Sequence, residues 1–144
     1  MGNYYPPVGF HFKVEFSHLK DESQFQEISG LNMELETEQI AEGGENRFKH
    51  KLPVRSKFSN LILKRGVKVS SELIKWCRDT MENFGAIVPA DLTISLLNAE
   101  HEPLMTWNVV HAWPVKWSVS DLNAEQSKIS VETIELAYNY FKIQ

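Results

Sequence analysis

An alternation of apolar and polar residues recurs along the chain in short segments. Residues 10–16 are the clearest case, because every second residue from Phe10 to Phe16 is apolar. A period of two predicts a strand with one buried face. The other segments that we expect to form strands are residues 31–36, 48–54, 61–63, 92–96, 104–113, 114–119 and 129–141.

Three places interrupt this strand pattern. A short extended segment at residues 25–28 leads into Gly30, which we interpret as a bulge or kink. Residues 43–44 are a glycine pair in a charged run, which predicts a hairpin loop longer than a two-residue turn. Within residues 129–141 the apolar positions change parity, and this change predicts a bulge near Thr133.

One segment follows a helical period instead. Its apolar residues recur at intervals of three and four, so they share one face of a helix that begins after Ser70 and ends before Gly85. We expect this face to pack against a sheet. The core set of the helix is Leu73, Trp76, Cys77 and Met81, with Thr80 beside them.

Together these elements predict a mainly β fold. Roughly seven or eight strands and one helix suit two packed antiparallel sheets, arranged as a sandwich or barrel with the helix packed on it. A chain of 144 residues has the size of one domain, so we expect a single domain over residues 1–144. Residues 1–9 are rich in Pro and Tyr and are predicted to form an extended N-terminal arm.

The charge balance argues against nucleic-acid recognition. The net charge is -4 and the pI is near 5.7, whereas binding to a phosphate backbone needs a basic face. A single cysteine excludes an intrachain disulfide. The N-terminus lacks the basic and apolar regions of a secretory signal, and no stretch approaches a membrane span, so we expect synthesis in the cytoplasm without a signal peptide.

The sequence shows no recognisable catalytic set. It has no GxSxG, P-loop or GxGxxG motif, and Cys77 falls on the apolar face of the predicted helix. The histidines are His11, His18, His50, His101 and His111. None has the spacing of a preformed metal site; we interpret four as surface residues and His111 as a residue near a strand end. We therefore expect no enzyme activity, no cofactor and no metal.

Two groups of residues leave other interpretations open. Glu34 and Glu36 share a strand face, as a general acid–base pair could, although solvated strand faces show this pattern more often. Trp107, Trp113 and Trp117 could form a platform for a sugar or a base. We favour core packing for the three tryptophans, because they alternate with polar neighbours.

Three ordered stretches of the chain are similar to a known family. The first comprises residues 6–16 and 25–31, the second comprises residues 44–53 and 60–66, and the third comprises residues 114–117, 122–124 and 131–137. In this order and spacing they resemble the tail tube proteins of contractile phages and of related extracellular injection systems, over nearly the whole chain. Tyr138 stands where the family usually has a histidine.

This resemblance implies a structural function. Family members form homohexameric rings that stack into a hollow tube, and strands from each subunit join one continuous barrel around the lumen. The implied partners are other copies of the chain, a sheath protein, baseplate or tube-initiator proteins and cap proteins, with effector cargo or a tape measure in the lumen. The implied location is a phage-tail-like particle, assembled from subunits made in the bacterial cytoplasm.

Two alternatives remain beside the tube subunit. One is a tube-initiator or baseplate-hub ring protein of the same machine, which would share the fold. The other belongs to a different class and is a monomeric β-barrel that binds a small ligand.

We expect two surfaces to carry the assembly. The ring-stacking hypothesis covers Tyr4, Tyr5, Glu42, Gly43, Gly44, Glu45, Asn46 and Arg47. The lumen hypothesis covers Lys13, Glu15, Asn32, Glu34, Glu36, Glu135 and Asn139, which would make the wall net negative. The apolar neighbours expected to face the helix and the second sheet are Phe12, Val14, Met33, Leu35, Ile134 and Leu136.

Overall fold

The computed structural model describes residues 11–19, 23–40, 50–66, 72–83, 88–120 and 130–144. Within these ranges the chain forms ten strands and one helix, which confirms the predicted mainly β fold. The strands are β1 (His11–Phe16), β2 (Ser23–Phe25), β3 (Glu27–Ser29), β4 (Met33–Ile40), β5 (His50–Phe58), β6 (Leu61–Gly66), β7 (Ala90–Leu97), β8 (Pro103–Val119), β9 (Val131–Ala137) and β10 (Tyr140–Ile143), and the helix is α1 (Glu72–Glu82). No helix in these ranges is long and apolar enough to span a membrane.

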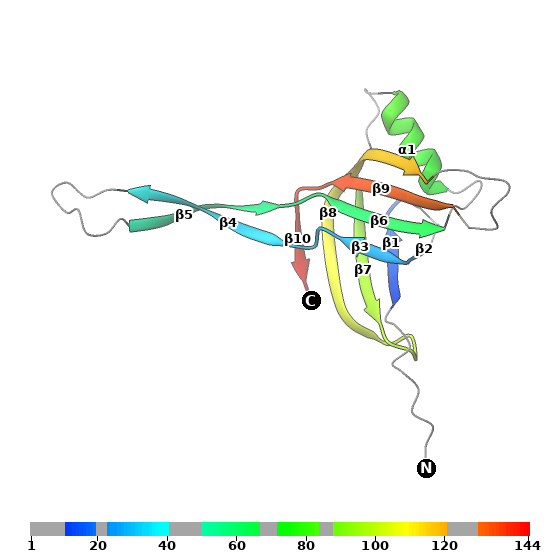
Figure 1. The fold of residues 1–144 in the computed structure, drawn as a ribbon, viewed down its shortest axis with the longest axis horizontal. Helices are drawn as coiled ribbons and strands as arrows, with labels where there is room; N and C mark the ends of the chain where they lie inside the picture. The colour runs from blue at the N-terminus through cyan, green and yellow to red at the C-terminus, as the bar shows by residue number, and fades with distance from the viewer. Residues whose placement is uncertain (1–10, 20–22, 41–49, 67–71, 84–87, 121–129) are drawn as a thin grey trace, which may run out of the picture.

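Eight of the strands form an antiparallel sheet in the order β2-β1-β7-β8-β9-β6-β3, with β10 also beside β8 (Figure 1). The first half of β8 pairs with β7 and β10, and its second half pairs with β9. The sheet therefore folds at β8 into two halves that enclose a common core. Its outermost strands, β2 and β3, are joined by Gln26, whose amide donates to the Lys64 carbonyl oxygen at 2.8 Å.

A single strand, β8, replaces the two strands predicted at residues 104–113 and 114–119. His111, which we placed near a strand end, lies inside β8 in the left-handed region, with φ at 55°, and its amide donates to Asp91 Oδ1 at 3.0 Å. A register shift follows between Pro114 and Lys116. This left-handed residue and the irregularity after it turn the strand from one half of the sheet to the other without ending it.

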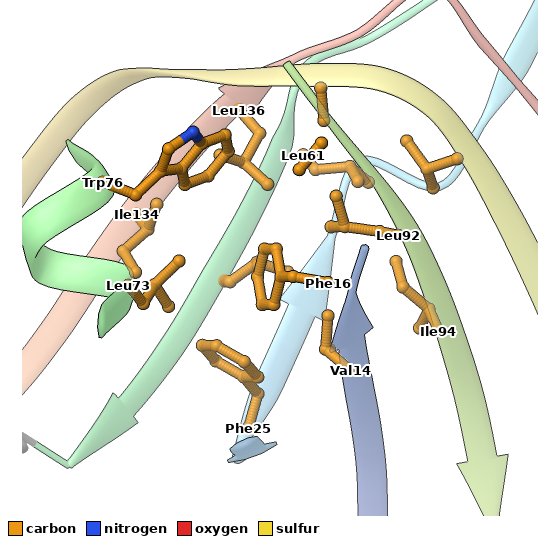
Figure 2. Packing of buried hydrophobic residues seen from close by; sticks show 14 of the residues in the cluster. Val14, Phe16, Phe25, Leu61, Leu73, Trp76, Leu92, Ile94, Ile134 and Leu136 are labelled. Carbon is orange, nitrogen blue, oxygen red and sulfur yellow. The ribbon is translucent and has the colours of Figure 1, made fainter. Parts of the chain in front are cut away.

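The core lies between the two halves of the sheet. Val14 and Phe16 of β1 point toward the side chains of the opposite half, among them Ile134 and Leu136 of β9 (Figure 2). Phe12 is partly buried on the same face, as the alternation predicts, and Phe10 lies outside the described residues. The residues of the buried apolar cluster are Val14, Phe16, Phe25, Leu61, Leu63, Leu73, Trp76, Cys77, Ala90, Leu92, Ile94, Val109, Ala112, Ile134, Leu136 and Phe141.

The bulge predicted near Thr133 is wrong. Thr133 lies opposite Lys64 and opposite Ser118 in regular register, and the segment instead breaks between β9 and β10. The apparent change of parity has a simple cause. Glu132 is fully buried in phase with Ile134, so a charged residue occupies a position where the pattern leads us to expect an apolar one.

Helix α1 covers the core at one end of the folded sheet (Figures 1 and 2). Leu73, Trp76 and Cys77 are buried, and Met81 is partly buried. The Trp76 indole meets Phe16 edge-on at 5.9 Å between ring centroids, and its Nε1 donates to the Val88 carbonyl oxygen at 2.7 Å. Ser70 and Gly85, which we expected to flank this helix, lie outside the described residues.

Strands β4 and β5 form a separate two-stranded ribbon that projects from the body (Figure 1). Gly30 precedes the ribbon with φ at 93°, and a Cβ atom there would lie 2.0 Å from the Asn60 carbonyl oxygen, so the predicted kink is confirmed. The expectation that Met33 and Leu35 face the helix and a second sheet is wrong. These side chains are 52% and 58% exposed, because no second layer of the chain covers the ribbon within the described residues.

Candidate assembly surfaces

One face of the ribbon carries ordered charges. Glu34 lies opposite Lys57, and Glu36 lies opposite Arg55, whose Nε is 2.7 Å from Glu36 Oε2. The hydrogen bond from Arg55 lowers the pKa of Glu36 below its ordinary value. Glu36 is therefore held as a carboxylate by an arginine, and this ion pair fits a solvated strand face better than a general acid–base pair.

Apolar side chains also crowd the ribbon. Met33, Leu35, Leu52 and Val54 are each about half exposed. A two-stranded ribbon is only marginally stable by itself, and a large exposed apolar group on it marks a contact surface. The ribbon therefore has the properties of a segment that packs on another polypeptide.

A polar face runs across four strands of the body. In one row, Glu15 of β1 lies opposite Thr93 of β7, Thr93 opposite Asn108 of β8, and Asn108 opposite Lys142 of β10. In the next row, Lys13, Ser95 and Thr106 lie side by side in the same way. Because strand side chains alternate between faces, this polar face lies on the side away from the core residues Val14 and Ile94.

The residues predicted to line the lumen fall on separate surfaces of the chain. Lys13 and Glu15 lie on the polar face and pair with each other, with 3.1 Å between Nζ and Oε1. Glu34 and Glu36 lie on the ribbon, and Asn32 precedes it, its Oδ1 accepting a hydrogen bond from Ser59 at 2.8 Å.

The remaining two predicted lumen residues lie in other parts of the chain. Glu135 lies on the outer face of β9, in the other half of the sheet, and accepts a hydrogen bond from Asn60 at 3.1 Å. Asn139 lies in the short connection between β9 and β10. The predicted ring-stacking residues, Tyr4, Tyr5, Glu42, Gly43, Gly44, Glu45, Asn46 and Arg47, are outside the described residues.

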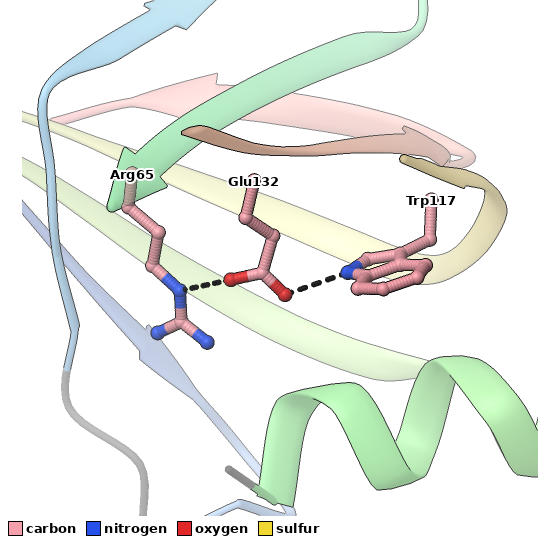
Figure 3. A network of polar contacts seen from close by, with 3 residues as sticks. All are labelled: Arg65, Trp117 and Glu132. Carbon is pink, nitrogen blue, oxygen red and sulfur yellow. Dashed lines mark hydrogen bonds and ion pairs between the residues drawn. The ribbon is translucent and has the colours of Figure 1, made fainter. Parts of the chain in front are cut away.

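A buried polar network lies beneath α1 (Figure 3). Arg65 Nε donates to Glu132 Oε2 at 2.8 Å, and Trp117 Nε1 donates to Glu132 Oε1 at 2.6 Å. The Arg65 and Glu132 side chains are 4% and 0% exposed, so both charges are withdrawn from water. The network fixes Trp117 against the helix. Sequence patterns did not reveal this ion pair, because its members are 67 residues apart.

Trp117 does not take the core position expected for it, since it is 37% exposed. Its ring, with Ile74 and Met81 of α1, lines a small apolar groove of about 210 Å³. Trp107 packs partly buried against the core, and Trp113 is partly buried. The three tryptophans therefore do not act as one set.

The described residues offer little chemistry for a reaction. Burial raises the pKa of the Cys77 thiol to about 12, with a further contribution from the Glu132 carboxylate, so the thiol stays protonated at neutral pH. Among these residues, no three or more His, Cys, Asp or Glu side chains gather around a common point.

Two histidines nevertheless meet in the fold. His11 Nε2 and His101 Nδ1 are 2.9 Å apart, and the rings are edge-on with centroids 4.8 Å apart. The two residues are 90 positions apart in the sequence, so their spacing could not predict the contact. The register of β1 with β7 brings them together, because His11 lies opposite Leu97 at the start of the turn that carries His101.

Comparison with protein-family models gives one match over most of the chain. Residues 8–142 match the model of the T4-like virus tail tube protein gp19. A comparison with curated protein sequences gave no match.

Comparison with solved structures gives matches over whole chains. A chain of the anti-feeding prophage baseplate, solved with six-fold symmetry, is 31% identical with a TM-score of 0.80, and the match covers 100% of this chain and 97% of that one. A chain of the PVC extracellular contractile injection system sheath-tube complex is 29% identical with a TM-score of 0.78, covering 97% and 92%. Hcp1 from Flavobacterium johnsoniae shares the fold at 13% identity, with a TM-score of 0.55 and coverage of 93% and 94%.

Proposed function

The chain belongs to the T4-like virus tail tube protein family and is a tube subunit of a contractile injection system, and we propose that it works as a homohexameric ring that stacks into a hollow conduit. The observation that carries this proposal is the match of a whole chain to a whole chain in two injection machines, at about 30% identity. In this architecture, contraction of a sheath drives the tube through a target envelope. The subunit is structural and performs no catalytic step.

The ring is the first element of the proposal. A similar chain belongs to an assembly solved with six-fold symmetry. Here the ribbon exposes Met33 and Leu35 to solvent. Within the described residues, β10 pairs with β8 on one of its edges, and no strand pairs with its other edge. When one surface of a subunit packs on a different surface of the next copy, the copies form a closed ring if the rotations from copy to copy add up to a full turn. We therefore place the ribbon against a neighbouring subunit.

The lumen is the second element. A conduit wall should let cargo slide, and exposed apolar surface would bind partly folded polypeptide. The polar face meets this requirement, because its two rows consist of hydroxyl, amide and charged side chains. Within these rows Lys13 and Lys142 outnumber Glu15, so this face does not supply the negative potential that we expected.

Stacking and partners complete the proposal. Residues 1–9 and 42–47 contact the next ring; residues 42–47 join the two strands of the ribbon, and the projection of this ribbon from the body supports their role. The other partners are a sheath protein, a baseplate or initiator ring and a cap protein, and the lumen holds effector cargo or a tape measure. The subunit is made in the bacterial cytoplasm without a signal peptide and functions in a phage-tail-like particle.

A tube-initiator ring is the second candidate, because the anti-feeding prophage chain that matches comes from a baseplate. Subunit copy number separates the two, since a tube protein is abundant in a purified particle and an initiator is scarce. A ligand-binding barrel is disfavoured, because fully buried side chains such as Leu63, Ile94 and Ile134 fill the interior.

Native mass measurement and negative-stain microscopy of the purified chain test the proposal. We expect hexamers, and ring-shaped or tubular particles with a central channel. The double variant Met33→Ser/Leu35→Ser should keep the monomer fold but lose rings, whereas Glu34→Ser, on the other face of the ribbon, should retain them. A chain that stays monomeric at high concentration, even when sheath and baseplate proteins are supplied, would contradict the proposed function.

A further inference from the structure

The contact between His11 and His101 is built on a rigid turn. His101 lies in the left-handed region with φ at 62°, and its amide donates to the Asn98 carbonyl oxygen at 3.0 Å. The Asn98 side-chain oxygen also accepts from the amides of Glu100 and Glu102, at 3.0 and 2.9 Å. These bonds hold His101 in a backbone conformation that few residues other than glycine adopt.

The backbone of His11, the other member of the pair, belongs to the sheet. His11 is the first residue of β1 and lies opposite Leu97, the last residue of β7. The pair therefore sits at the end of the body where β1 begins, away from α1 (Figure 1). His11 is partly exposed and His101 is exposed, so water and small ions reach both rings.

The separation of the two nitrogens matches the ligands of a transition metal. Imidazole nitrogens bind such metals at about 2.0–2.1 Å. Two neighbouring ligands at right angles are then about 2.8–3.0 Å apart, whereas tetrahedral ligands would be about 3.3–3.4 Å apart. The observed distance between His11 Nε2 and His101 Nδ1 is 2.9 Å. The pair already has the spacing of adjacent positions in a square-planar or octahedral site.

We propose that His11 and His101 form a two-histidine binding site for a divalent transition metal of the Ni²⁺ or Cu²⁺ type, with water in the other positions. Without metal, one ring donates its N–H to the other. On binding, the donor ring shifts its hydrogen to its other nitrogen by exchange with solvent, which leaves both facing nitrogens available to the metal. The acidic side chains of Glu100 and Glu102 in the same turn favour a cation nearby.

Metal at this site would tie the start of β1 to the turn between β7 and β8. The two segments already touch through one hydrogen bond, and two coordinate bonds would replace it. A ligand that binds only the folded chain raises its stability by mass action. This inference does not depend on the tube architecture, because all of its residues belong to one chain.

Titration calorimetry with Ni²⁺ on the untagged chain tests the site. We expect one Ni²⁺ per chain, and His11→Asn and His101→Asn should each weaken binding at least tenfold. His111→Asn is the matched control, because His111 is also an exposed histidine with a left-handed backbone, which asparagine tolerates. It should bind Ni²⁺ as the wild type does.

Thermal unfolding in EDTA first checks that each variant folds. If the His101→Asn variant does not fold, the His11→Asn variant alone decides the test. The proposal is overturned if the His11→Asn variant and the His111→Asn variant bind Ni²⁺ equally well. It is also overturned if the wild type shows no saturable binding at millimolar Ni²⁺.

Discussion

At the scale of single residues, the buried Glu132 organises one end of the core. Its carboxylate receives hydrogen bonds from both Arg65 and Trp117. A buried ion pair does not add much stability by comparison with apolar packing, but it is costly to break. The network therefore links β6, β8 and β9 to one another beneath the helix.

Removal of this carboxylate should destabilise the chain strongly. Glu132→Ala should lower the free energy of unfolding by about 3–5 kcal/mol, because the buried Arg65 guanidinium and the Trp117 indole both lose their hydrogen bond to this carboxylate. Glu135→Ala is the matched control on the same strand, since Glu135 lies on the outer face, and it should cost about 1 kcal/mol or less. Urea unfolding measures both. Equal effects of the two variants would mean that the ion pair contributes little.

The Cys77 thiol predicts a dependence of stability on pH. Burial raises the pKa of this thiol from 9.0 to about 12 in the folded chain. Because the unfolded thiol ionises near its ordinary pKa, this contribution is fully present below pH 9 and is lost as the pH rises toward 12. Unfolding midpoints of the wild type and of Cys77→Ala, measured from pH 8 upward, should therefore converge. A constant difference between them would contradict the assignment.

Sequence patterns predicted the burial of single residues correctly where an apolar side chain occupies a core position. Val14 and Phe16 are apolar and buried, as the alternation predicts. Glu132 breaks this agreement, because it is charged and buried, so the pattern around it suggested a bulge that is absent from β9. The meeting of His11 with His101 depends on strand register across the whole sheet, which local patterns do not contain.

At the scale of elements, the ribbon and the long strand β8 are the features that local patterns misread. The alternation at residues 31–36 predicts a buried face, yet Met33 and Leu35 are exposed. A half-buried strand and a strand awaiting a partner chain have the same sequence pattern, since both need one apolar face. Likewise, one continuous bent strand and two separate strands would show similar sequence patterns around Pro114, and the structure has the continuous strand β8.

Gly30 sets the direction in which the ribbon leaves the body. Gly30→Ala should cost more than about 1 kcal/mol, because the new methyl group would meet the Asn60 backbone and the positive φ strains any other residue. Ser29→Ala, at the neighbouring position, should change stability by about 0.5 kcal/mol or less. Thermal unfolding of the two variants makes the comparison. A Gly30→Ala chain as stable as the Ser29→Ala chain would show that the kink relaxes freely.

At the scale of the whole molecule, the fold separates surfaces with different properties. The ribbon carries exposed apolar residues, the polar face carries hydroxyl and amide groups, and α1 closes the core at one end. A tube subunit needs this separation, because contacts between copies require apolar burial, whereas a wall that cargo passes should not bind it. The polar face and the outer face of β9 are the two candidates for that wall.

Substitution of one threonine on each face can show which of the two faces lines the lumen. Thr93 lies in the middle of β7 on the polar face, Thr133 lies in the middle of β9 on the outer face, and both are partly exposed. Thr93→Lys would add six positive charges to each hexameric ring at the wall that we propose, and these charges would attract anions over about 8 Å at physiological salt. Thr133→Lys adds the same charge to the other face. Both variants should form tubes, but only Thr93→Lys should increase the anionic stain retained in the channel, measured as central density in negative-stain images. If Thr133→Lys instead fills the channel with stain while Thr93→Lys leaves it unchanged, the lumen is lined by β9 and its neighbours, and the proposed assignment of faces is reversed.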